Sequence, residues 1–291
     1  MTSKRPVTII GLGPMGQAMA NTFLDNGHQV TLWNRTASRA DALVARGAVL
    51  ATSVTEAVKA NDLTILSLTD YDAVYAVLEP AAAVLSSHVF VNLSSDNPEK
   101  TRAGSRWITE RGGVHITGGV TVPPSGIGQA ESKTFYSGPR AEFDQYKSTL
   151  EVLTSTDYRG EDPGLAALMY QIGMAMFWPS MLSYWQAIAV ANANGLKAAD
   201  ILAHANETML NMPNFLGFYA ERIDNNNHEG DVDRLAMGLA SVEHVLHTIG
   251  DAGVDTSFQA AVVAFFQRGV KAGHADQSFS SIVELMKNPT A

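Results

Sequence analysis

VTIIGLGPMGQAMA, residues 7–20, decides the fold of this 291-residue chain. A short, mostly apolar run, VTII, leads into three glycines with the spacing G-x-G-x-x-G, and a helical pattern begins at Pro14. In such a strand–turn–helix unit the first glycine permits the turn, the second lets the backbone approach a pyrophosphate, and the third packs helix against strand. The phosphates then rest on the first amides of the helix. The motif predicts a dinucleotide-binding turn formed by Gly11, Leu12, Gly13, Pro14, Met15 and Gly16.

Short apolar runs alternate with helical patterns in the first half of the chain. The runs VTIIGLG, QVTLWNR, LTILSLTD and VFVNLSS have the composition of strands buried on both faces, and VHITGGV, KTFYSG and STDYRG add shorter strands. This alternation indicates βαβ units and a parallel sheet. We therefore predict an α/β chain. A Rossmann-type doubly wound sheet occupies residues 1–160, and an all-α domain that begins with a long interdomain helix occupies residues 161–291.

The helical half has three further features. No Asp, Glu, Lys or Arg occurs in residues 164–196, a length that could cross a bilayer. Because polar residues interrupt this segment and no basic cluster flanks it, we favour a helix buried by protein over a membrane span. KAADILAHANETMLNM and PNFLGFYAERIDNNN are interpreted as successive helices, and DNNNHEGD, residues 224–231, as a long flexible loop.

Composition excludes several classes of function. The formal net charge is −9, which opposes binding to nucleic acid. The chain has no cysteine, so disulfides and thiolate metal sites are excluded, and its histidines form no convincing metal-binding pattern. The N-terminal residues lack the apolar stretch of a signal peptide, so we expect a cytoplasmic protein.

An arginine ends the second predicted strand. Arg35 lies where an acidic residue would accept the ribose 2′-hydroxyl of NAD, and its planar cation instead suits a 2′-phosphate. Asn34 and Thr36 add neutral hydrogen bonds, and Arg39 lies one turn further on. We therefore predict NADPH/NADP+ as cofactor. The ends of later strands complete the predicted cofactor site with Ser67, Leu68, Thr69, Asn92, Ser94 and Val120.

These motifs resemble a known superfamily. GLGPMG, GHQVTLWNRT and RADALVARGA resemble the start of the β-hydroxyacid dehydrogenases. SLTDYDAVYAVL, VNLSSDNPEKT, GGVTVPPSGIG, FYSGPRAEFDQYK and GLAALMYQIGMAMFW are similar to the narrower family of NADPH-dependent imine reductases and reductive aminases. The resemblance covers nearly the whole chain. It implies reduction of (cyclic) imines or iminium ions to amines, and an intertwined homodimer with a cleft between one subunit's Rossmann domain and the other's helical domain.

Departures from the hydroxyacid enzymes favour the imine branch. Those enzymes hold a carboxylate on a Ser-Gly-Gly loop, whereas the chain here has Val122 followed by two prolines, which supply no N–H donors. They also use a lysine in the interdomain helix, and this chain has no lysine between Lys147 and Lys197. The resemblance aligns Tyr170 with the catalytic position. A phenol is protonated at neutral pH, so Tyr170 can donate a hydrogen bond or a proton, or can simply shape the pocket.

Apolar residues around Tyr170 form the expected substrate pocket. Residues at helical spacing follow it on one face, and methionine and aromatic side chains make an adaptable apolar wall. A polar residue in some relatives aligns with Gly238, which suggests a less polar pocket here. The predicted pocket residues are Val122, Met174, Phe177, Trp178, Met181, Met209, Met212, Phe215 and Gly238. Three alternatives remain at this stage: a carbonyl/alcohol oxidoreductase of the β-hydroxyacid type, a reductive aminase, and a non-catalytic NADP sensor.

Overall fold

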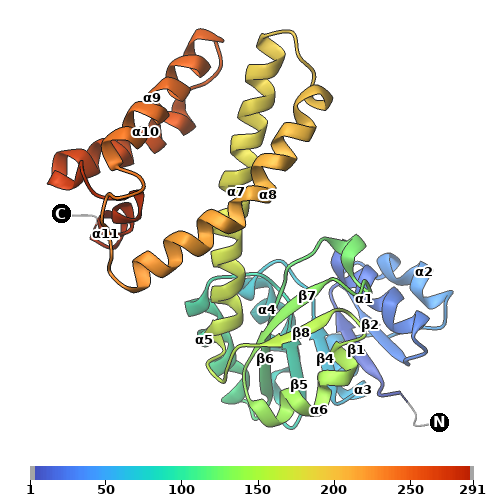
Figure 1. The fold of residues 1–291 in the computed structure, drawn as a ribbon. Coiled ribbons are helices and arrows are strands. Elements are labelled where there is room, and N and C mark those ends of the chain that lie inside the picture. The colour runs from blue at the N-terminus through green and yellow to red at the C-terminus, as the bar shows by residue number, and fades with distance from the viewer. Residues whose placement is uncertain (1–3, 289–291) are drawn as a thin grey trace. The chain divides into compact units, whose positions relative to one another are not determined.

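The computed structural model describes residues 4–288 (Figure 1). The chain divides into two compact units, and the boundary in the sequence lies between Ala175 and Met176. The first unit contains β1 (Val7–Ile10), α1 (Pro14–Asp25), β2 (Val30–Trp33), α2 (Asp41–Val44), β3 (Val49–Leu50), α3 (Val54–Ala60), β4 (Leu63–Leu66), α4 (Tyr71–Leu78), β5 (Val89–Asn92), α5 (Pro98–Thr109), β6 (Val114–Val120), β7 (Lys133–Ser137), α6 (Arg140–Leu150), β8 (Ser155–Tyr158) and the start of α7 (Gly164–Ala193). Short 3₁₀ turns cover Ala37–Ala40, Glu79–Val84 and Pro124–Gly126.

All eight strands form one sheet in the order β3-β2-β1-β4-β5-β6-β7-β8. Every neighbouring pair is parallel except β6 and β7, which run antiparallel. The strand order reverses direction on either side of β1, as in a doubly wound sheet. The predicted Rossmann-type fold is therefore confirmed. The strand β3 escaped prediction because it has only two residues and neither is buried.

Helices cover both faces of the sheet. One core cluster joins β1 to α1, α2 and α6 through Phe23, Leu43 and Phe143, and the other joins the opposite face to α3, α4 and α5. The central strands β1, β4 and β5 are buried at every position, which explains their continuous apolar sequences. Side-chain oxygens of Asp70 and Asn97 accept N–H groups in the first turns of α4 and α5, so both helices are capped where they follow the short loops after β4 and β5.

A buried histidine lies between β6 and α4. The Tyr71 hydroxyl is 3.1 Å from His115 Nε2, and both side chains are fully or almost fully buried. Burial lowers the pKa of His115 to about 3 and raises the pKa of Tyr71 to about 12. Within the folded protein the imidazole is therefore neutral, and its Nε2 shares one hydrogen bond with the protonated phenol.

The second unit continues α7, and its described residues, up to 288, add helices and no strand. These are α8 (Ala198–Asp224), α9 (Leu235–Asp251), α10 (Ser257–Gly269) and α11 (Ile282–Lys287), with a π-turn at Val270–His274 and a 3₁₀ turn at Phe279–Ser281. The prediction of two helices that meet at Pro213 is wrong, because α8 runs through this residue. Its surroundings are exposed, so the Met209 carbonyl that loses its N–H partner remains accessible to water.

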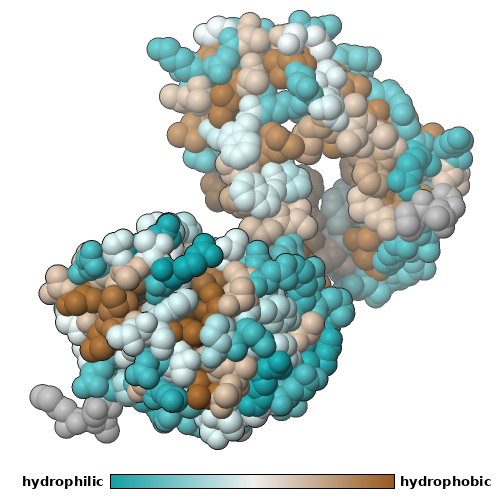
Figure 2. Space-filling model, turned by 180° about the vertical axis from the view of Figure 1, so that it is seen from behind, coloured by the Kyte–Doolittle hydropathy of each residue, from teal (hydrophilic) through white to brown (hydrophobic). Residues whose placement is uncertain are grey.

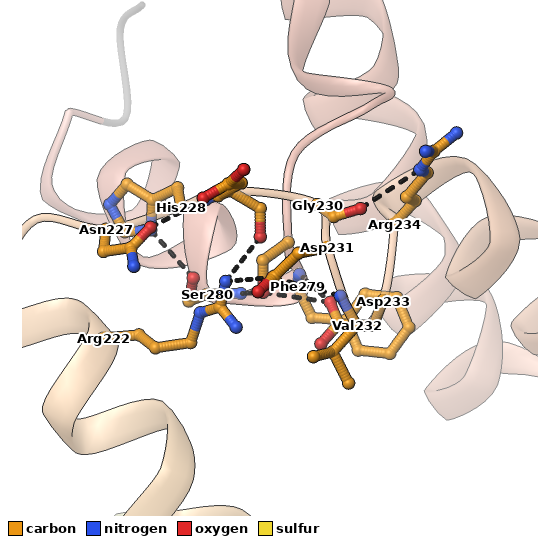
Figure 3. A network of polar contacts seen from close by, with 12 residues as sticks. Arg222, Asn227, His228, Gly230, Asp231, Val232, Asp233, Arg234, Phe279 and Ser280 are labelled. Carbon is orange, nitrogen blue, oxygen red and sulfur yellow. Dashed lines mark hydrogen bonds and ion pairs between the residues drawn. The ribbon is translucent and has the colours of Figure 1, made fainter.

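The loop predicted to be flexible, residues 224–231, is instead tied down by polar contacts (Figure 3). Arg222 at the end of α8 is buried and forms an ion pair with Asp231. On the other side of the loop, His228 Nδ1 lies 2.8 Å from Ser280 Oγ. The contact between His228 and Ser280 joins distant parts of the sequence, and the ion pair of Arg222 crosses the whole loop, so the local run of polar residues did not reveal them.

The charge-free helix α7 is poorly covered within one chain. Its most apolar 18-residue window is 11% buried, so a single chain does not supply the burial expected from the sequence. Trp178 on α7 is 57% exposed, and on α8 Phe215 is 54% and Leu210 78% exposed. Figure 2 shows hydrophobic patches at the surface of the helical unit. Monomeric proteins rarely leave so many large apolar side chains in water.

We predict that His115 makes the first unit sensitive to acid. Above a pH of about 6.5 the histidine is neutral in both the folded and unfolded states. Below this pH the unfolded chain binds a proton that the folded protein excludes down to a pH of about 3. The free energy of unfolding should thus fall by up to about 1.4 kcal/mol per pH unit as the pH drops through this range.

Denaturant unfolding at several pH values measures this slope in the native protein and in His115→Gln, which cannot titrate. The variant should have the shallower acid limb. The same change at the exposed His247 is the control and should leave the slope as it is. Equal slopes in native protein and His115→Gln would contradict the prediction.

Candidate active site

A cavity of about 410 Å³ opens at the carboxyl ends of β1, β2 and β4. Ligands of doubly wound sheets bind at this edge, where the strand order reverses. The cavity is lined by Gly11, Leu12, Gly13, Pro14, Met15, Trp33, Asn34, Arg35, Thr36, Arg39, Ser67, Leu68, Thr69, Ala73 and Val77. Twelve of these were predicted from the sequence as cofactor residues, although they come from three separate segments.

The glycine turn is shaped by close backbone contacts. Gly11 has a φ of +99°, and a Cβ there would lie 2.2 Å from the Ser67 carbonyl oxygen. A Cβ at Gly16 would lie 1.9 Å from the Gly11 carbonyl oxygen, so α1 can approach β1 only without a side chain. At Gly13 nothing lies within 4 Å, and that open space borders the cavity. The turn therefore leaves room beside the N-terminus of α1 for a pyrophosphate.

Asn34 braces this turn against the end of β2. Its Oδ1 accepts the Leu12 N–H at 2.9 Å, and its Nδ2 donates to the Thr36 carbonyl at 2.8 Å. The side chain was predicted to bind the cofactor directly. In the structure these two hydrogen bonds engage it with the protein backbone, so its first task is to hold Leu12 and Thr36 in place.

The cavity has a positive end. Arg35 and Arg39 are both exposed, and neither forms an ion pair with any residue of the described range 4–288. No Asp or Glu is among the lining residues. Two guanidinium groups without a carboxylate partner suit a dianionic phosphomonoester.

Three residues that were not predicted from the sequence also line the cavity. Trp33 precedes Asn34 at the end of β2, and Ala73 and Val77 lie one turn apart on α4. Their apolar side chains lie on the same cavity as the two arginines. The i, i+4 spacing after the loop Ser67–Thr69 was the available signal, but most such pairs belong to a core.

Four of the predicted cofactor residues do not line the cavity. Gly16 packs beneath the turn, and Val120 ends β6. Asn92 and Ser94 are buried behind the loop that follows β4: Asn92 Oδ1 accepts the Ser94 N–H at 2.9 Å, and Ser94 Oγ accepts the Leu68 N–H at 3.0 Å. These two side chains hold the loop that carries Leu68.

Tyr170 lies at the carboxyl end of β6, next to the last residues of that strand. A Cβ added to Gly119 would lie 2.9 Å from Tyr170 Cβ and 3.0 Å from the Ala166 carbonyl oxygen. Strand and helix are thus in direct contact, and Tyr170 is half-buried. Val122 follows on the adjoining loop, where it is packed against the core of the first unit.

The remaining predicted pocket residues lie on α7, α8 and α9. Met174, one turn after Tyr170, is half-buried. Phe177 and Trp178 on α7 and Met209, Met212 and Phe215 on α8 are exposed in the second unit, and Met181 is half-buried there.

Gly238, which was predicted to line the substrate pocket, lies on α9 (Leu235–Asp251). It is buried, and a Cβ at this position would lie 2.4 Å from Phe266 and 2.7 Å from Phe279. Close packing against Phe266 and Phe279 inside the second unit leaves no room for a side chain at this position.

Both parts of the chain match known families. Residues 6–160 match the NAD binding domain of 6-phosphogluconate dehydrogenase, and residues 162–288 match the NADPH-dependent reductive aminase-like C-terminal domain. The chain is 30% identical to an NADPH-dependent reductive aminase of Aspergillus oryzae, over 97% of each protein.

Solved structures agree. An imine reductase of Streptomyces aurantiacus is 62% identical with a TM-score of 0.95, and the match covers 97% of this chain and 99% of that one. A reductive aminase from Aspergillus terreus in complex with NADPH and ethyl-5-oxohexanoate is 29% identical with a TM-score of 0.93, over 97% of this chain and 99% of that one.

The doubly wound sheet and the cavity at its reversal point define a dinucleotide-dependent oxidoreductase. The chain belongs to the family of NADPH-dependent imine reductases and reductive aminases. It is accordingly an enzyme that uses NADPH to reduce C=N bonds, which confirms the family, activity and cofactor expected from the sequence. The residues present fit this cofactor, because the open space at Gly13 suits its pyrophosphate, and Arg35 and Arg39, which have no ion-pair partner among residues 4–288, suit its additional phosphate.

Proposed function

We propose that this protein reduces cyclic imines and iminium ions to amines, with the cofactor bound in the cavity between β1, β2 and β4. The observation that carries the proposal is the pair of unpaired arginines at one end of that cavity, together with a lysine-free helix that presents a tyrosine at the end of β6. The domain that binds cofactor ends near residue 160, and the helical domain that follows serves substrate binding and assembly.

The cavity residues divide the work of holding the cofactor. The first N–H groups of α1 receive the pyrophosphate in the space beside Gly13, since no side chain caps this helix within the described chain. Arg35 and Arg39 bind the 2′-phosphate. Trp33 and Val77 give the neighbouring adenine an apolar wall.

Reduction of a C=N bond does not require a strong general acid from the protein. Bound NADPH supplies a hydride to the carbon of the C=N bond. Protonation of the imine nitrogen already makes the carbon of the C=N bond electrophilic, so the chain mainly positions the substrate and excludes water. The Tyr170 hydroxyl donates a hydrogen bond to the nitrogen of a neutral imine, and its oxygen accepts one from the N–H of an iminium ion. Met174 continues the apolar wall along the helix. A carbonyl substrate would need a stronger acid, and α7 offers no lysine for that role.

A second copy of the chain covers the exposed apolar side chains of α7 and α8. The segment from Phe177 to Phe218 carries most of the large exposed hydrophobic residues of the described chain. We infer a homodimer in the cytoplasm in which the helical units interlock. A membrane is a weaker explanation, because the second family domain begins at residue 162 and so includes the whole of α7.

Turnover with defined substrates tests the activity. Following NADPH absorbance, we expect oxidation with 1-pyrrolines and little with 2-methyl-3-oxopropanoate. Addition of a ketone together with an amine shows whether the enzyme also performs reductive amination.

Tyr170→Phe should lower kcat by roughly tenfold to a hundredfold with little change in KM, since only the hydrogen bond to nitrogen is lost. Tyr75→Phe, a half-buried tyrosine on α4, is the matched control. Preference for the carbonyl substrate would refute the proposal.

Cofactor selectivity tests Arg35. Removing its guanidinium in Arg35→Ala should weaken NADPH binding by about tenfold or more, because a charge-assisted fork to phosphate is lost. NADH binding, which has no partner for this group, should stay the same. Titration calorimetry measures both, with Arg106→Ala on α5 as an exposed arginine outside the cavity. An unchanged ratio of the two affinities would exclude Arg35 from the site.

The molar mass in solution tests assembly. Light scattering after size exclusion should give roughly twice the chain mass of 31.1 kDa. The double variant Leu210→Glu with Phe215→Glu should shift the protein to the monomer, since buried charges oppose the apolar contact. Val49→Glu places a charge on an exposed apolar residue of β3 and should leave the mass unchanged. A native monomer would rule out the homodimer.

A further inference from the structure

The beginning of α7 is fixed to the first unit by several independent contacts. The guanidinium of Arg102 forms a fork with the Asp162 carboxylate, with distances of 2.9 Å and 2.8 Å. Ser137 Oγ donates to the Pro163 carbonyl at 2.9 Å and accepts the Ala166 N–H at 3.0 Å. These contacts all lie before Tyr170 and hold the first turn of the helix.

One further contact lies directly after Tyr170. Gln171 Nε2 donates to the main-chain carbonyl of Asp96 at 3.1 Å. Gln171 is half-buried, and within the described chain it is the only residue of α7 whose side chain forms a hydrogen bond to the loop after β5. Because Asp96 accepts through its backbone, the contact fixes the path of that loop and does not depend on charge.

The loop after β5 in turn holds the loop that lines the cavity. Asp96 Oδ2 accepts the Tyr71 N–H at 3.3 Å, and Ser94 Oγ accepts the Leu68 N–H at 3.0 Å. Leu68 and Thr69 both line the cavity. The residue beside Tyr170 is thus connected to the wall of the cofactor cavity through two hydrogen bonds, Gln171 to Asp96 and Leu68 to Ser94, and the short main-chain segment between Asp96 and Ser94.

We propose that Gln171 is a positioning residue for hydride transfer: its amide sets the distance between Tyr170 and the loop that lines the cofactor cavity. This inference rests on the proposed function, because it concerns the geometry of the same site. Loss of the amide leaves the anchors at Arg102 and Ser137 in place, so the helix stays attached. The second attachment, at the position where the substrate nitrogen meets Tyr170, is released.

The test compares Gln171→Leu, which has a similar size and no donor, with Gln171→Lys, whose ammonium group can again donate to the Asp96 carbonyl. Turnover of 1-pyrroline, the KM for this imine, NADPH affinity and the deuterium isotope effect with cofactor deuterated at the transferred position are measured. In Gln171→Leu we expect kcat to fall roughly tenfold to a hundredfold and the isotope effect to rise, with NADPH affinity within about twofold of native. Gln171→Lys should recover most of kcat.

Asp162→Asn is the control for mere attachment of the helix, because it weakens the fork to Arg102. It should lower the melting temperature while the isotope effect stays native. If Gln171→Leu behaves in this way, or keeps native kcat, Gln171 has no positioning role and the inference is overturned. If the native enzyme itself does not reduce the imine, the proposed function fails and the inference falls with it. The native reaction run in parallel distinguishes the two failures.

Discussion

The close approach of α1 to β1 at Gly16 is the contact on which the site depends. Because a side chain at Gly16 would overlap the Gly11 carbonyl, only glycine lets the helix begin directly above the end of the strand. That placement aims the helix N-terminus at the cavity and aligns Gly11 beside Ser67 of the neighbouring strand loop. Asn34 also connects the turn to the end of β2 through the Leu12 N–H, so the ends of β1, β2 and β4 are held next to one another.

Local patterns in the sequence predicted much of this arrangement. The glycine spacing, the apolar strands and the arginine after β2 are each recognisable from a few consecutive residues. The fold brings them together because parallel strands place their carboxyl ends at the same edge of the sheet. Features that depend on a particular tertiary contact were missed. Arg222 orders a loop of polar residues by reaching across to Asp231, and Gly238 owes its identity to Phe266 and Phe279. Neither relation leaves a periodic signal.

The long helix α7 has two different surroundings along its length. Its first turns are fixed by an ion pair, a serine and the close contact with Gly119, so Tyr170 inherits the rigidity of the sheet. Its later turns carry large apolar side chains at an exposed surface. The first turns therefore lack charged residues because they pack on the sheet, and the later turns because they form an apolar surface. The sequence alone does not distinguish these two reasons.

The exposed apolar surface of α7 and α8 also has a thermodynamic consequence. For a chain that buries this surface against its own copy, folding and assembly are linked by mass action. The melting temperature of such a protein rises with its concentration, and dilution alone can destabilise the helical unit while the sheet, with its own two-sided core, is affected less.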